Sequence, residues 1–275
     1  MAEKTEYDMI QEATSFIRER WNKKADVGVV LGTGLGGLAD RITADAVVSY
    51  DEIPYFAPST VESHVGKLIL GTLEGKSVVA MQGRLHYYEG YSPKQITFPI
   101  RVMKALGAEI LIVSNACGGM NPQFKPGDVM LIEDHINLLG CNPLVGKNDD
   151  RLGPRFPDMC EPYSKELIAL ARKVALEQGV MTQQGVYVAT PGPNLETRAE
   201  YRFFRAIGGD VVGMSTVPEV IVAVHSGMKV LGFSIVTDMG LPDALEPADL
   251  SRILQNAGAA EPKMNAIICG VLKNL

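Results

Sequence analysis

Residues 83–90 read GRLHYYEG and place a cation, a titratable ring and a phenol at every second position. Side chains of an extended chain alternate between two faces, so Arg84, His86 and Tyr88 are expected to point one way and the residues between them the other. A guanidinium fork, an imidazole and a hydroxyl together suit an oxyanion such as phosphate. The stretch therefore predicts one wall of an anion site.

Two other parts of the chain carry groups of the same kind. Thr33 lies in the glycine-rich stretch GTGLGG, where backbone N–H groups suit a small anion. His64 lies in the polar stretch STVESHVGK, and Ser215 follows the apolar run VVGM, where the start of a helix would favour an anion. Each residue has an ordinary alternative as a structural histidine, a turn residue or a surface cation. Together they form the ligand set of one phosphate.

The glycine-rich stretch also fits another class of site. Gly32, Gly34 and Gly37 match the pattern GxGxxG after an apparent strand, and Asp51 supplies an acidic residue about 20 positions further on, as in dinucleotide-binding proteins. A parallel crossover takes about a dozen residues, however, and little more than LADRIT precedes the next apparent strand. A hairpin then follows in place of another βα unit. The sequence favours a small-anion loop, with a ligand-free turn and a dinucleotide-binding protein as alternatives.

Local periodicity predicts the elements that position these residues. Apolar residues at helical spacing predict helices at 10–21, 92–107, 164–179, 196–208, from Val217 onward and over most of 249–273. Short apolar runs predict strands at 27–31, 46–50, 109–113, 129–133, 186–190, 211–214 and 229–236, and a hairpin at 67–81. Strands that alternate with helices predict an α/β fold with a largely parallel sheet between helices. One domain covering residues 1–275 is the simplest interpretation.

Composition limits the classes of partner. The chain has 275 residues, of which 46% are hydrophobic, and this is enough for a full core. Its formal net charge is −6 and its pI is about 5.3, so we expect neither nucleic acid nor a membrane as a partner. Four scattered cysteines without a CxxC pattern predict reduced thiols and no metal site. The N-terminus lacks a signal-peptide layout, so we expect a cytoplasmic protein.

Seven stretches, in order, place the chain in a family context. The chain closely resembles the trimeric purine nucleoside phosphorylases on LGTGLGGL (31–38), STVESHVGKL (59–68), GRLHYYEGY (83–91), SNACGGM (114–120), GPRFPDM (153–159), PGPNLET (191–197) and VVGMSTVPEV (211–220). This resemblance covers nearly the whole chain. It implies the nucleoside phosphorylase fold, which is a mixed, twisted β-sheet partly closed into a barrel and flanked by helices.

The resemblance also implies roles for individual positions. The matches to the family's phosphate ligands are Thr33, His64, Arg84, His86, the Ala116 backbone and Ser215. The matches to its purine site are Ala116, Gly118, Leu195, Glu196, Val212, Met214 and Asp238. The matches to its ribose site are Tyr88, Met214, Leu250 and Phe156, and Phe156 would come from the neighbouring subunit of a homotrimer. Of these residues, His86, Glu196 and Asp238 would act in catalysis.

The implied activity is that of a pentosyltransferase. A purine ribonucleoside or 2′-deoxyribonucleoside and orthophosphate would give the free purine and (deoxy)ribose 1-phosphate. Orthophosphate is the co-substrate, and the resemblance implies no metal or organic cofactor. Bond breakage leaves positive charge on the sugar and negative charge on the purine, so the site must stabilise both. His86 would orient the ribose, Glu196 would hold the N1–H edge of the base, and Asp238 would face N7.

Three positions depart from the common family pattern. Asp238 replaces the usual asparagine, and a carboxylate accepts from a 6-amino group but must carry a proton to donate to N7. We therefore expect wider tolerance for 6-aminopurines such as adenosine, with a solvated turn carboxylate as the ordinary alternative. Leu195 replaces a common phenylalanine, and Leu250 a histidine that meets the 5′-hydroxyl. Asp238 and Leu250 resemble the 5′-methylthioadenosine phosphorylases, which stay as the alternative, whereas Glu196 favours an ordinary purine nucleoside phosphorylase.

Overall fold

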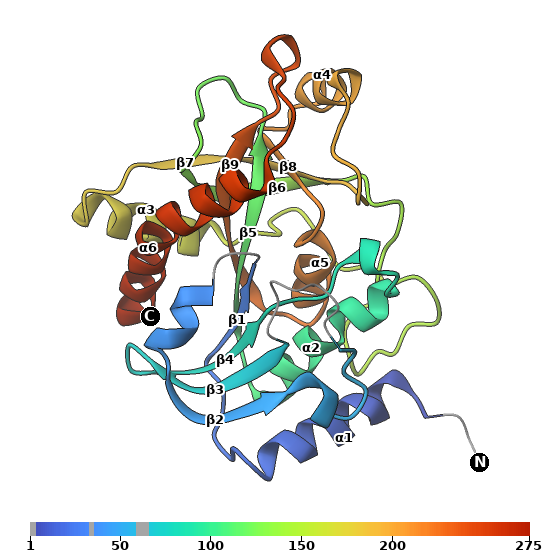
Figure 1. Cartoon of the computed structure of the whole chain (residues 1–275). Helices are drawn as coiled ribbons and strands as arrows, with labels where there is room; N and C mark the ends of the chain where they lie inside the picture. Colours follow the sequence, from blue (N-terminus) through green and yellow to red (C-terminus); the bar gives the residue numbers. More distant parts are fainter. Residues whose placement is uncertain (1–3, 33–35, 59–65) are drawn as a thin grey trace.

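The computed structural model describes residues 4–32, 36–58 and 66–275, so Thr33 and His64 lie outside the described residues. Within them one sheet runs through the molecule in the order β2-β3-β4-β1-β5-β8-β7-β6-β9, and β5 pairs in addition with β9 (Figure 1). Its strands are β1 (Val27–Leu31), β2 (Thr43–Ser49), β3 (Lys67–Leu73), β4 (Lys76–Gln82), β5 (Ile110–Gly119), β6 (Val129–Asn137), β7 (Thr182–Ala189), β8 (Val211–Gly213) and β9 (Lys229–Met239).

The β5–β9 pairing closes part of the sheet into a barrel. Strands β5, β8, β7, β6 and β9 each pair with the next, and β9 returns to β5, while β1, β4, β3 and β2 extend the sheet outward from β5. The pairs β2–β3, β3–β4, β5–β8 and β6–β9 are antiparallel, and the other pairs are parallel. The mixed, partly closed sheet implied by the family resemblance is confirmed. The largely parallel sheet expected from the alternation of elements is only partly correct, because hairpins and barrel closure add antiparallel pairs.

Helices cover this sheet on two sides. They are α1 (Glu6–Arg18), α2 (Pro93–Leu106), α3 (Lys165–Glu177), α4 (Arg198–Ala206), α5 (Val217–His225) and α6 (Leu250–Asn274). Helices α1, α2 and α5 pack in succession on one side, and α3 and α6 pack together on the other (Figure 1). One large apolar cluster fills the space between these layers.

The signals at the ends of α2 act as the sequence predicts. The Ser92 hydroxyl accepts from the backbone N–H of Gln95, and Pro93 occupies the first turn, where its missing N–H costs no hydrogen bond. Gly107 ends the helix with φ of 114°, a left-handed conformation that favours glycine. Ile96 of this helix packs in a small apolar cluster with Leu85, the residue between Arg84 and His86.

Two strands continue well beyond the apolar runs that predicted them. Strand β5 extends to Gly119 and β9 to Met239, whereas the apolar runs end at residues 113 and 236. The two strands stay paired along this extension, with Gly118 opposite Asp238 after a bulge at Cys117. A bulge re-aims side chains and is common beside active sites. The ladder therefore carries polar residues from both strands to one end of the barrel.

The described elements on either side of the glycine-rich stretch do not form a dinucleotide-binding unit. After β1 the chain forms a short 3-10 helix (Gly36–Arg41) and then β2, which pairs with β3 and not with β1. A Cβ atom on Gly32 would lie 2.7 Å from the Ser114 carbonyl oxygen and 2.9 Å from the Asn115 Cα, so glycine lets two backbones approach closely here. The βαβ topology required by the dinucleotide alternative is absent from residues 27–32, 36–58 and 66–82.

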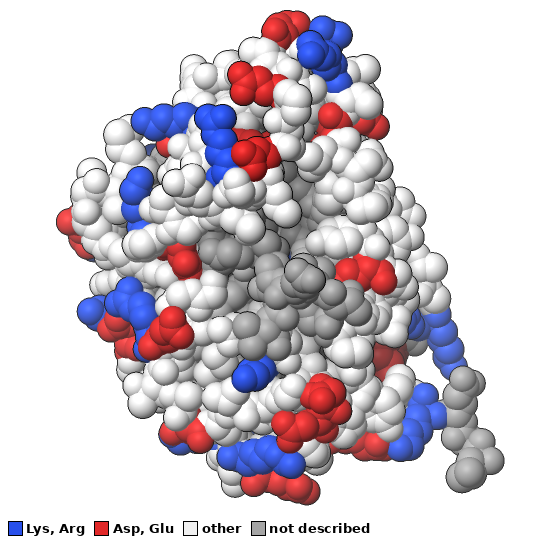
Figure 2. Space-filling view, viewed as in Figure 1, with Lys and Arg blue, Asp and Glu red and all other residues white. Residues whose placement is uncertain are grey.

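Charged residues are spread over the surface. Figure 2 shows Lys and Arg side chains interspersed with Asp and Glu on the face seen, without a broad basic patch. This distribution agrees with the net charge of −6. In the part of the chain that the structure describes, no helix combines the length and the apolar character needed to cross a membrane.

Candidate active site

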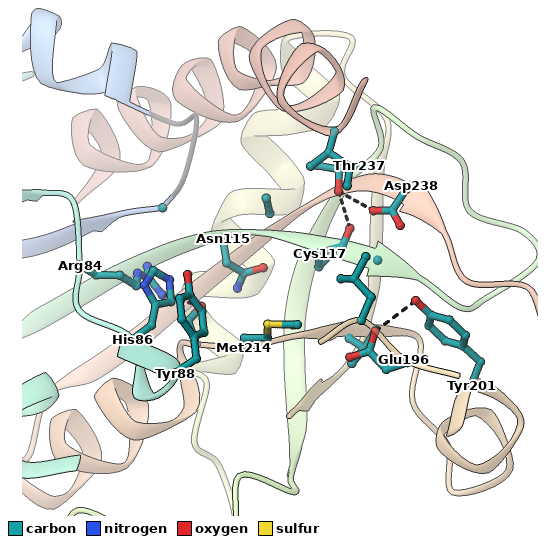
Figure 3. A pocket seen from close by; sticks show the side chains of 18 residues that line it. Arg84, His86, Tyr88, Asn115, Cys117, Glu196, Tyr201, Met214, Thr237 and Asp238 are labelled. Carbon is teal, nitrogen blue, oxygen red and sulfur yellow. Dashed lines mark hydrogen bonds between the residues drawn. The ribbon is translucent and has the colours of Figure 1, made fainter. Parts of the chain in front are cut away.

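One pocket of about 180 Å³ gathers residues from distant parts of the chain (Figure 3). It is lined by Gly32, Arg84, His86, Tyr88, Asn115, Ala116, Cys117, Gly118, Leu195, Glu196, Tyr201, Val212, Gly213, Met214, Ser215, Thr237, Asp238 and Ile253. We call the part around Arg84, His86 and Ser215 the cationic end, and the part around Glu196 and Asp238 the carboxylate end. In Figure 3, Met214 lies between the two ends.

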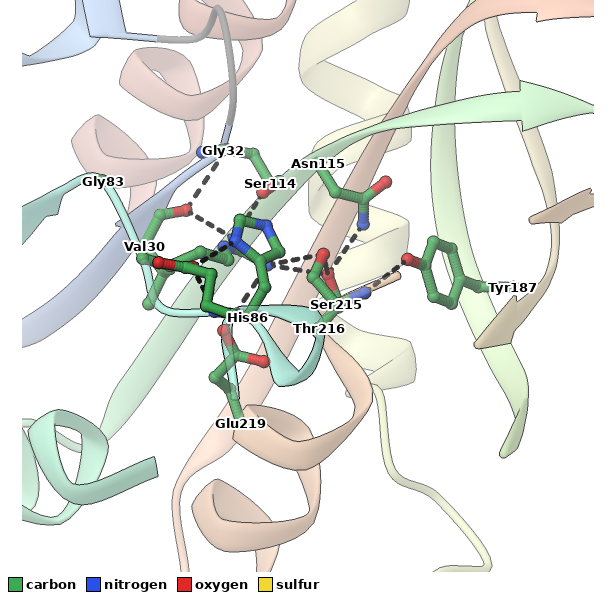
Figure 4. Close-up of polar contacts among 12 residues, drawn as sticks. Val30, Gly32, Gly83, His86, Ser114, Asn115, Tyr187, Ser215, Thr216 and Glu219 are labelled. Atoms are coloured by element: carbon green, nitrogen blue, oxygen red, sulfur yellow. Dashed lines mark hydrogen bonds and ion pairs between the residues drawn. The ribbon is translucent and has the colours of Figure 1, made fainter. Parts of the chain in front are cut away.

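Arg84 is the central group of the cationic end and is only 1% exposed. Its Nη1 donates to Ser215 Oγ at 3.1 Å and to Thr216 Oγ1 at 2.9 Å, and its Nη2 donates to the Ser114 carbonyl oxygen at 2.5 Å. Figure 4 labels the three acceptor residues, Ser114, Ser215 and Thr216. Arg84 and Ser215, which are 131 positions apart in sequence, are therefore in direct contact. A guanidinium held by several acceptors is preorganised, so little side-chain entropy is lost when it binds an anion.

A buried carboxylate accompanies this guanidinium. Glu219, in the first turn of α5, places its Oε1 3.5 Å from Arg84 Nη1, and the two side chains are 2% and 1% exposed. Among the described residues neither Glu219 carboxylate oxygen has a hydrogen-bond partner. Arg84 is thus the group that compensates the charge of Glu219, and loss of Arg84 would leave a buried carboxylate uncompensated.

A strained turn aims Ser215 at the pocket. Thr216 has φ of 71° and ψ of −53°, and the Val217 N–H donates to the Ser215 carbonyl oxygen at 2.8 Å, which defines a γ-turn. A β-branched residue at positive φ is strained, and such strain persists only where surrounding contacts fix it. The Thr216 hydroxyl accepts from Arg84 and from Asn115 Nδ2, and these bonds hold the turn.

His86 is oriented by its own segment. The Glu89 carboxylate accepts from the His86 backbone N–H at 2.7 Å and lies 3.0 Å from the ring Nδ1. The His86 ring stacks on Tyr88 with a centroid distance of 4.6 Å. The chain is extended only as far as His86 and then forms a 3-10 turn (Tyr87–Glu89). Arg84, His86 and Tyr88 nevertheless all line the pocket, as their alternation predicts.

The carboxylate end is built around Glu196. Its Oε1 accepts from the Thr190 hydroxyl at 3.1 Å, and its Oε2 accepts from the Tyr201 hydroxyl at 3.1 Å. Two donors on one carboxylate fix its plane. The Glu196 carboxylate is therefore suited to accept an N–H from a ligand in the pocket.

Asp238 faces the same end of the pocket from β9. Burial raises the pKa of the Asp238 carboxyl above its ordinary value, and the hydrogen bond from the Thr237 hydroxyl lowers it by a smaller amount. The Thr237 Oγ1 lies 2.8 Å from Asp238 Oδ1. A carboxyl group with a raised pKa holds a proton more readily than an ordinary aspartate, so Asp238 is able to donate as well as accept.

The raised pKa of Asp238 has a consequence for stability. Between the ordinary pKa of an aspartate and the raised pKa, the folded chain binds more protons than the unfolded chain, so the free energy of unfolding falls as pH rises through that window. We therefore expect Asp238→Asn to have a higher melting temperature than the parent at pH 7. The difference should shrink as pH falls through that window and should be gone below about 4. Melting curves from pH 3 to 8 test this, and a variant less stable than the parent at pH 7 would contradict it.

Most of the residues singled out in the sequence meet at this pocket. Those that line it are Arg84, His86, Tyr88, Ala116, Gly118, Leu195, Glu196, Val212, Met214, Ser215 and Asp238. Phe156 and Leu250 do not line it and are 84% and 69% exposed. Ile253, one helical turn after Leu250 in α6, lines the pocket instead. Leu250 is the first residue of α6, and the role that the resemblance implies for it stays a prediction.

Several residues that shape the site were not singled out in the sequence. Tyr201, Thr190 and Thr237 hold the two carboxylates, and Asn115 links Thr216 to Ser234 across the barrel. Thr237 directly follows one apolar run and Asn115 lies two residues after the end of another, and these positions were a usable signal. Tyr201 carried no such signal, because it lies on a helix face that also packs in the core.

The donor set gives no sign of a metal site. Among the residues that the structure describes, no group of three His, Cys, Asp or Glu side chains is placed to hold a metal ion. The expectation that no cofactor is needed is not tested by this finding and stays a prediction.

Comparisons with known proteins agree with this geometry. The family model of the phosphorylase superfamily matches residues 26–273. Purine nucleoside phosphorylase 1 of Geobacillus stearothermophilus is 50% identical over 266 residues, which are 97% of each chain. Purine nucleoside phosphorylase isoform 2 of Schistosoma mansoni, solved with cytosine and ribose-1-phosphate, superposes with a TM-score of 0.94 at 40% identity, over 98% of this chain and 97% of that one.

A second Schistosoma mansoni purine nucleoside phosphorylase structure, solved with adenosine, has a TM-score of 0.91 at 40% identity, over 97% of this chain and 96% of that one. A family model that covers most of the chain and relatives at this level of identity define the family. The chain belongs to the purine nucleoside phosphorylases of the phosphorylase superfamily.

Proposed function

We propose that this protein is a purine nucleoside phosphorylase, which converts a purine ribonucleoside or 2′-deoxyribonucleoside and orthophosphate reversibly into the free purine and (deoxy)ribose 1-phosphate. The observation that carries the proposal is the single pocket with two chemically different ends. Arg84, His86 and Ser215 at one end suit an oxyanion, and Glu196 and Asp238 at the other suit the N–H groups of a base. The names of the relatives support the same activity.

In this proposal phosphate binds at the cationic end. Arg84 offers a fixed fork of donors, Ser215 a hydroxyl, and Ala116 its backbone N–H. Thr33 and His64 would complete this ligand set, on the family resemblance alone. His86 orients the ribose and contacts phosphate, with its ring fixed by Glu89.

The ribose lies between the two ends, and the base lies at the carboxylate end. Tyr88 and Met214 contact the sugar, and Ile253 takes the place expected for Leu250 on the 5′ side. Leu195, Val212 and Gly118 enclose the faces of the base. Glu196 accepts the N1–H of a 6-oxopurine, and Asp238 donates to N7 when it carries a proton.

The chemical step replaces the bond between C1′ and N9 with a bond between C1′ and a phosphate oxygen. A phosphate oxygen forms a bond to C1′, and the electron pair of the C1′–N9 bond goes to the departing purine. The positive charge that develops on the sugar is stabilised by the phosphate beside it. The negative charge that develops on the purine is stabilised by the hydrogen bond from protonated Asp238 to N7. Orthophosphate is the only co-substrate, and we propose no metal or organic cofactor.

We further propose a homotrimer in the cytoplasm. Phe156 is 84% exposed, which is unusual for a large aromatic side chain, and it lies in a position where the family resemblance places it against the neighbouring subunit's ribose. All four cysteines are free, as expected in a reducing compartment. Sedimentation analysis of the protein should give three times the mass of the chain, and a monomer with full activity would contradict the shared site.

The 5′-methylthioadenosine phosphorylases are the alternative, and the comparisons do not favour them because the similar proteins are purine nucleoside phosphorylases. A substrate panel decides between the two. Inosine, guanosine, adenosine and 5′-methylthioadenosine are assayed with and without phosphate. Phosphate-dependent cleavage of inosine and guanosine supports the proposal, and exclusive cleavage of 5′-methylthioadenosine would support the alternative.

Asp238 should set the tolerance for 6-aminopurines. The carboxylate accepts from a 6-amino group, whereas an asparagine amide donates to both N7 and a 6-oxo group. We expect Asp238→Asn to lower the ratio of kcat/KM for adenosine to that for inosine by about tenfold, the equivalent of one hydrogen bond. Steady-state rates with both nucleosides at saturating phosphate measure this ratio. An unchanged ratio would show that Asp238 does not determine the preference between adenosine and inosine.

A further inference from the structure

Tyr201 is a buried side chain that reaches the carboxylate end of the pocket. It lies in α4, is 4% exposed, and packs in an apolar cluster with Met120, Val188, Phe204 and Val212. Its hydroxyl leaves this cluster and donates to Glu196 Oε2 at 3.1 Å, as Figure 3 shows. The residue therefore joins the core of the fold to the carboxylate that faces the base.

The surroundings hold the Tyr201 ring in one place. A Cβ atom on Gly240, two residues after Asp238, would collide with the Tyr201 ring, so the end of β9 accommodates the ring only because residue 240 is glycine. On the pocket side, the Cβ position of Gly118 lies 3.8 Å from Asp238 Oδ2 and 4.0 Å from the Tyr201 hydroxyl oxygen. The Tyr201 hydroxyl and both carboxylates thus border the same small space.

The surroundings of the Tyr201 hydroxyl keep it protonated, so it acts as a hydrogen-bond donor. Burial, then the charges of Glu196 and Asp238, raise the pKa of the Tyr201 phenol far above its ordinary value. The phenol therefore stays protonated at every working pH. Glu196 in turn accepts from two hydroxyl donors, Thr190 and Tyr201.

We propose that Tyr201 is a positioning residue that sets the base preference of the enzyme by holding the Glu196 carboxylate in place as an acceptor. This inference rests on the proposed function and assigns the substrate class of the same site. A 6-oxopurine presents an N1–H that needs an acceptor. A 6-aminopurine presents an unprotonated N1, which gains nothing from that acceptor. Tyr201 therefore favours 6-oxopurine nucleosides and opposes the 6-amino tolerance that Asp238 introduces.

The test is Tyr201→Phe, which removes the hydroxyl and keeps the ring. A hydrogen bond to a charged group contributes about tenfold or more in binding, so kcat/KM for inosine should fall by about tenfold. The value for adenosine should stay within about twofold of the parent, since N1 of adenine does not use the acceptor. A purely structural role would lower kcat/KM for both substrates equally and leave their ratio unchanged.

Controls separate the possible causes. Tyr163→Phe also removes a buried, hydrogen-bonded tyrosine hydroxyl, which lies 3.2 Å from His135 Nδ1 outside the pocket, and should leave the inosine-to-adenosine ratio unchanged. If Tyr201→Phe is unstable, Tyr201→Met fills the space with a flexible apolar side chain and should give the same change in ratio. In a Glu196→Gln background, the loss of the Tyr201 hydroxyl should cause no further loss with inosine, since the two residues act as a unit.

The outcomes are distinguishable. If the parent cleaves inosine with phosphate and Tyr201→Phe leaves the inosine-to-adenosine ratio unchanged, the inference is wrong while the proposed function stands. If the parent cleaves no purine nucleoside, the proposed function fails and this inference fails with it.

Discussion

Replacement of Arg84 by methionine is expected to raise the phosphate concentration needed for half-maximal rate by about 100- to 1,000-fold. The guanidinium is the one cationic side chain that lines the pocket among the described residues apart from the titratable His86, and two of its N–H groups would be lost to phosphate. Hydrogen bonds to a charged group contribute about 1.5–3 kcal/mol each, so two bonds near the lower end, about 3–4 kcal/mol together, give this increase. Initial rates with inosine at increasing phosphate measure the effect.

Arg84 also compensates the buried charge of Glu219, so the same variant should be less stable by about 3–5 kcal/mol. The double variant Arg84→Met/Glu219→Met removes both charges and should recover most of the melting temperature. It should not recover the use of phosphate. This pair of variants separates folding from binding, and a double variant with parental phosphate dependence would remove Arg84 from the proposed ligand set.

The second large effect is expected for Glu196→Gln, with a fall of about 100-fold in kcat/KM for inosine. Both Glu196 oxygens already accept a hydroxyl proton, from Thr190 and from Tyr201. A glutamine amide accepts through only one atom, so its NH₂ group would face a donor or the N1–H of the base. The loss combines a charge-assisted hydrogen bond with an unsatisfied donor, each about 1–3 kcal/mol. The phosphate concentration for half-maximal rate should stay parental.

A matched control lies four residues further along the chain. Glu200 caps the start of α4 through the Thr197 backbone N–H and does not line the pocket. Glu200→Gln keeps this cap and should leave the rate with inosine within about twofold of the parent. Equal losses in Glu196→Gln and Glu200→Gln would show that α4, and not the base contact, is responsible.

Local signals in the sequence predicted local structure well. The Ser92 cap, Pro93 and Gly107 define both ends of α2, and Glu74-Gly75 forms the turn between β3 and β4. These features depend on a few adjacent residues whose conformations are restricted in any context. The same holds for GRLHYYEG, where alternation placed three side chains on one face, although the last of them reaches the pocket from a 3-10 turn.

Long-range features were not predictable from the residues alone. Nothing in the apolar runs shows that β9 returns to β5 and closes a barrel, because strand pairing depends on tertiary packing. The ends of β5 and β9 were missed for a related reason. Asn115 and Asp238 are polar, so periodicity ends the strands before them, yet the ladder continues because both face a pocket and not the core.

The residues of the site also divide into those that the sequence indicated and those that only the fold defines. The residue types pointed to Arg84 and Ser215, and motif resemblance pointed to Glu196 and Asp238. That these four residues line one pocket is a result of the fold. Residues that act through others, such as Tyr201 and Glu219, have sequence contexts typical of helix and core positions. Their roles depend on distances that only the three-dimensional arrangement defines.

The amount of ribose 1-phosphate formed from inosine at increasing phosphate concentration tests the central claim most directly. If one pocket brings phosphate against the sugar carbon that releases the base, hypoxanthine and ribose 1-phosphate should appear in equal amounts, at a rate that saturates with phosphate and vanishes without it. Release of hypoxanthine together with free ribose, at a rate independent of phosphate, would contradict this account.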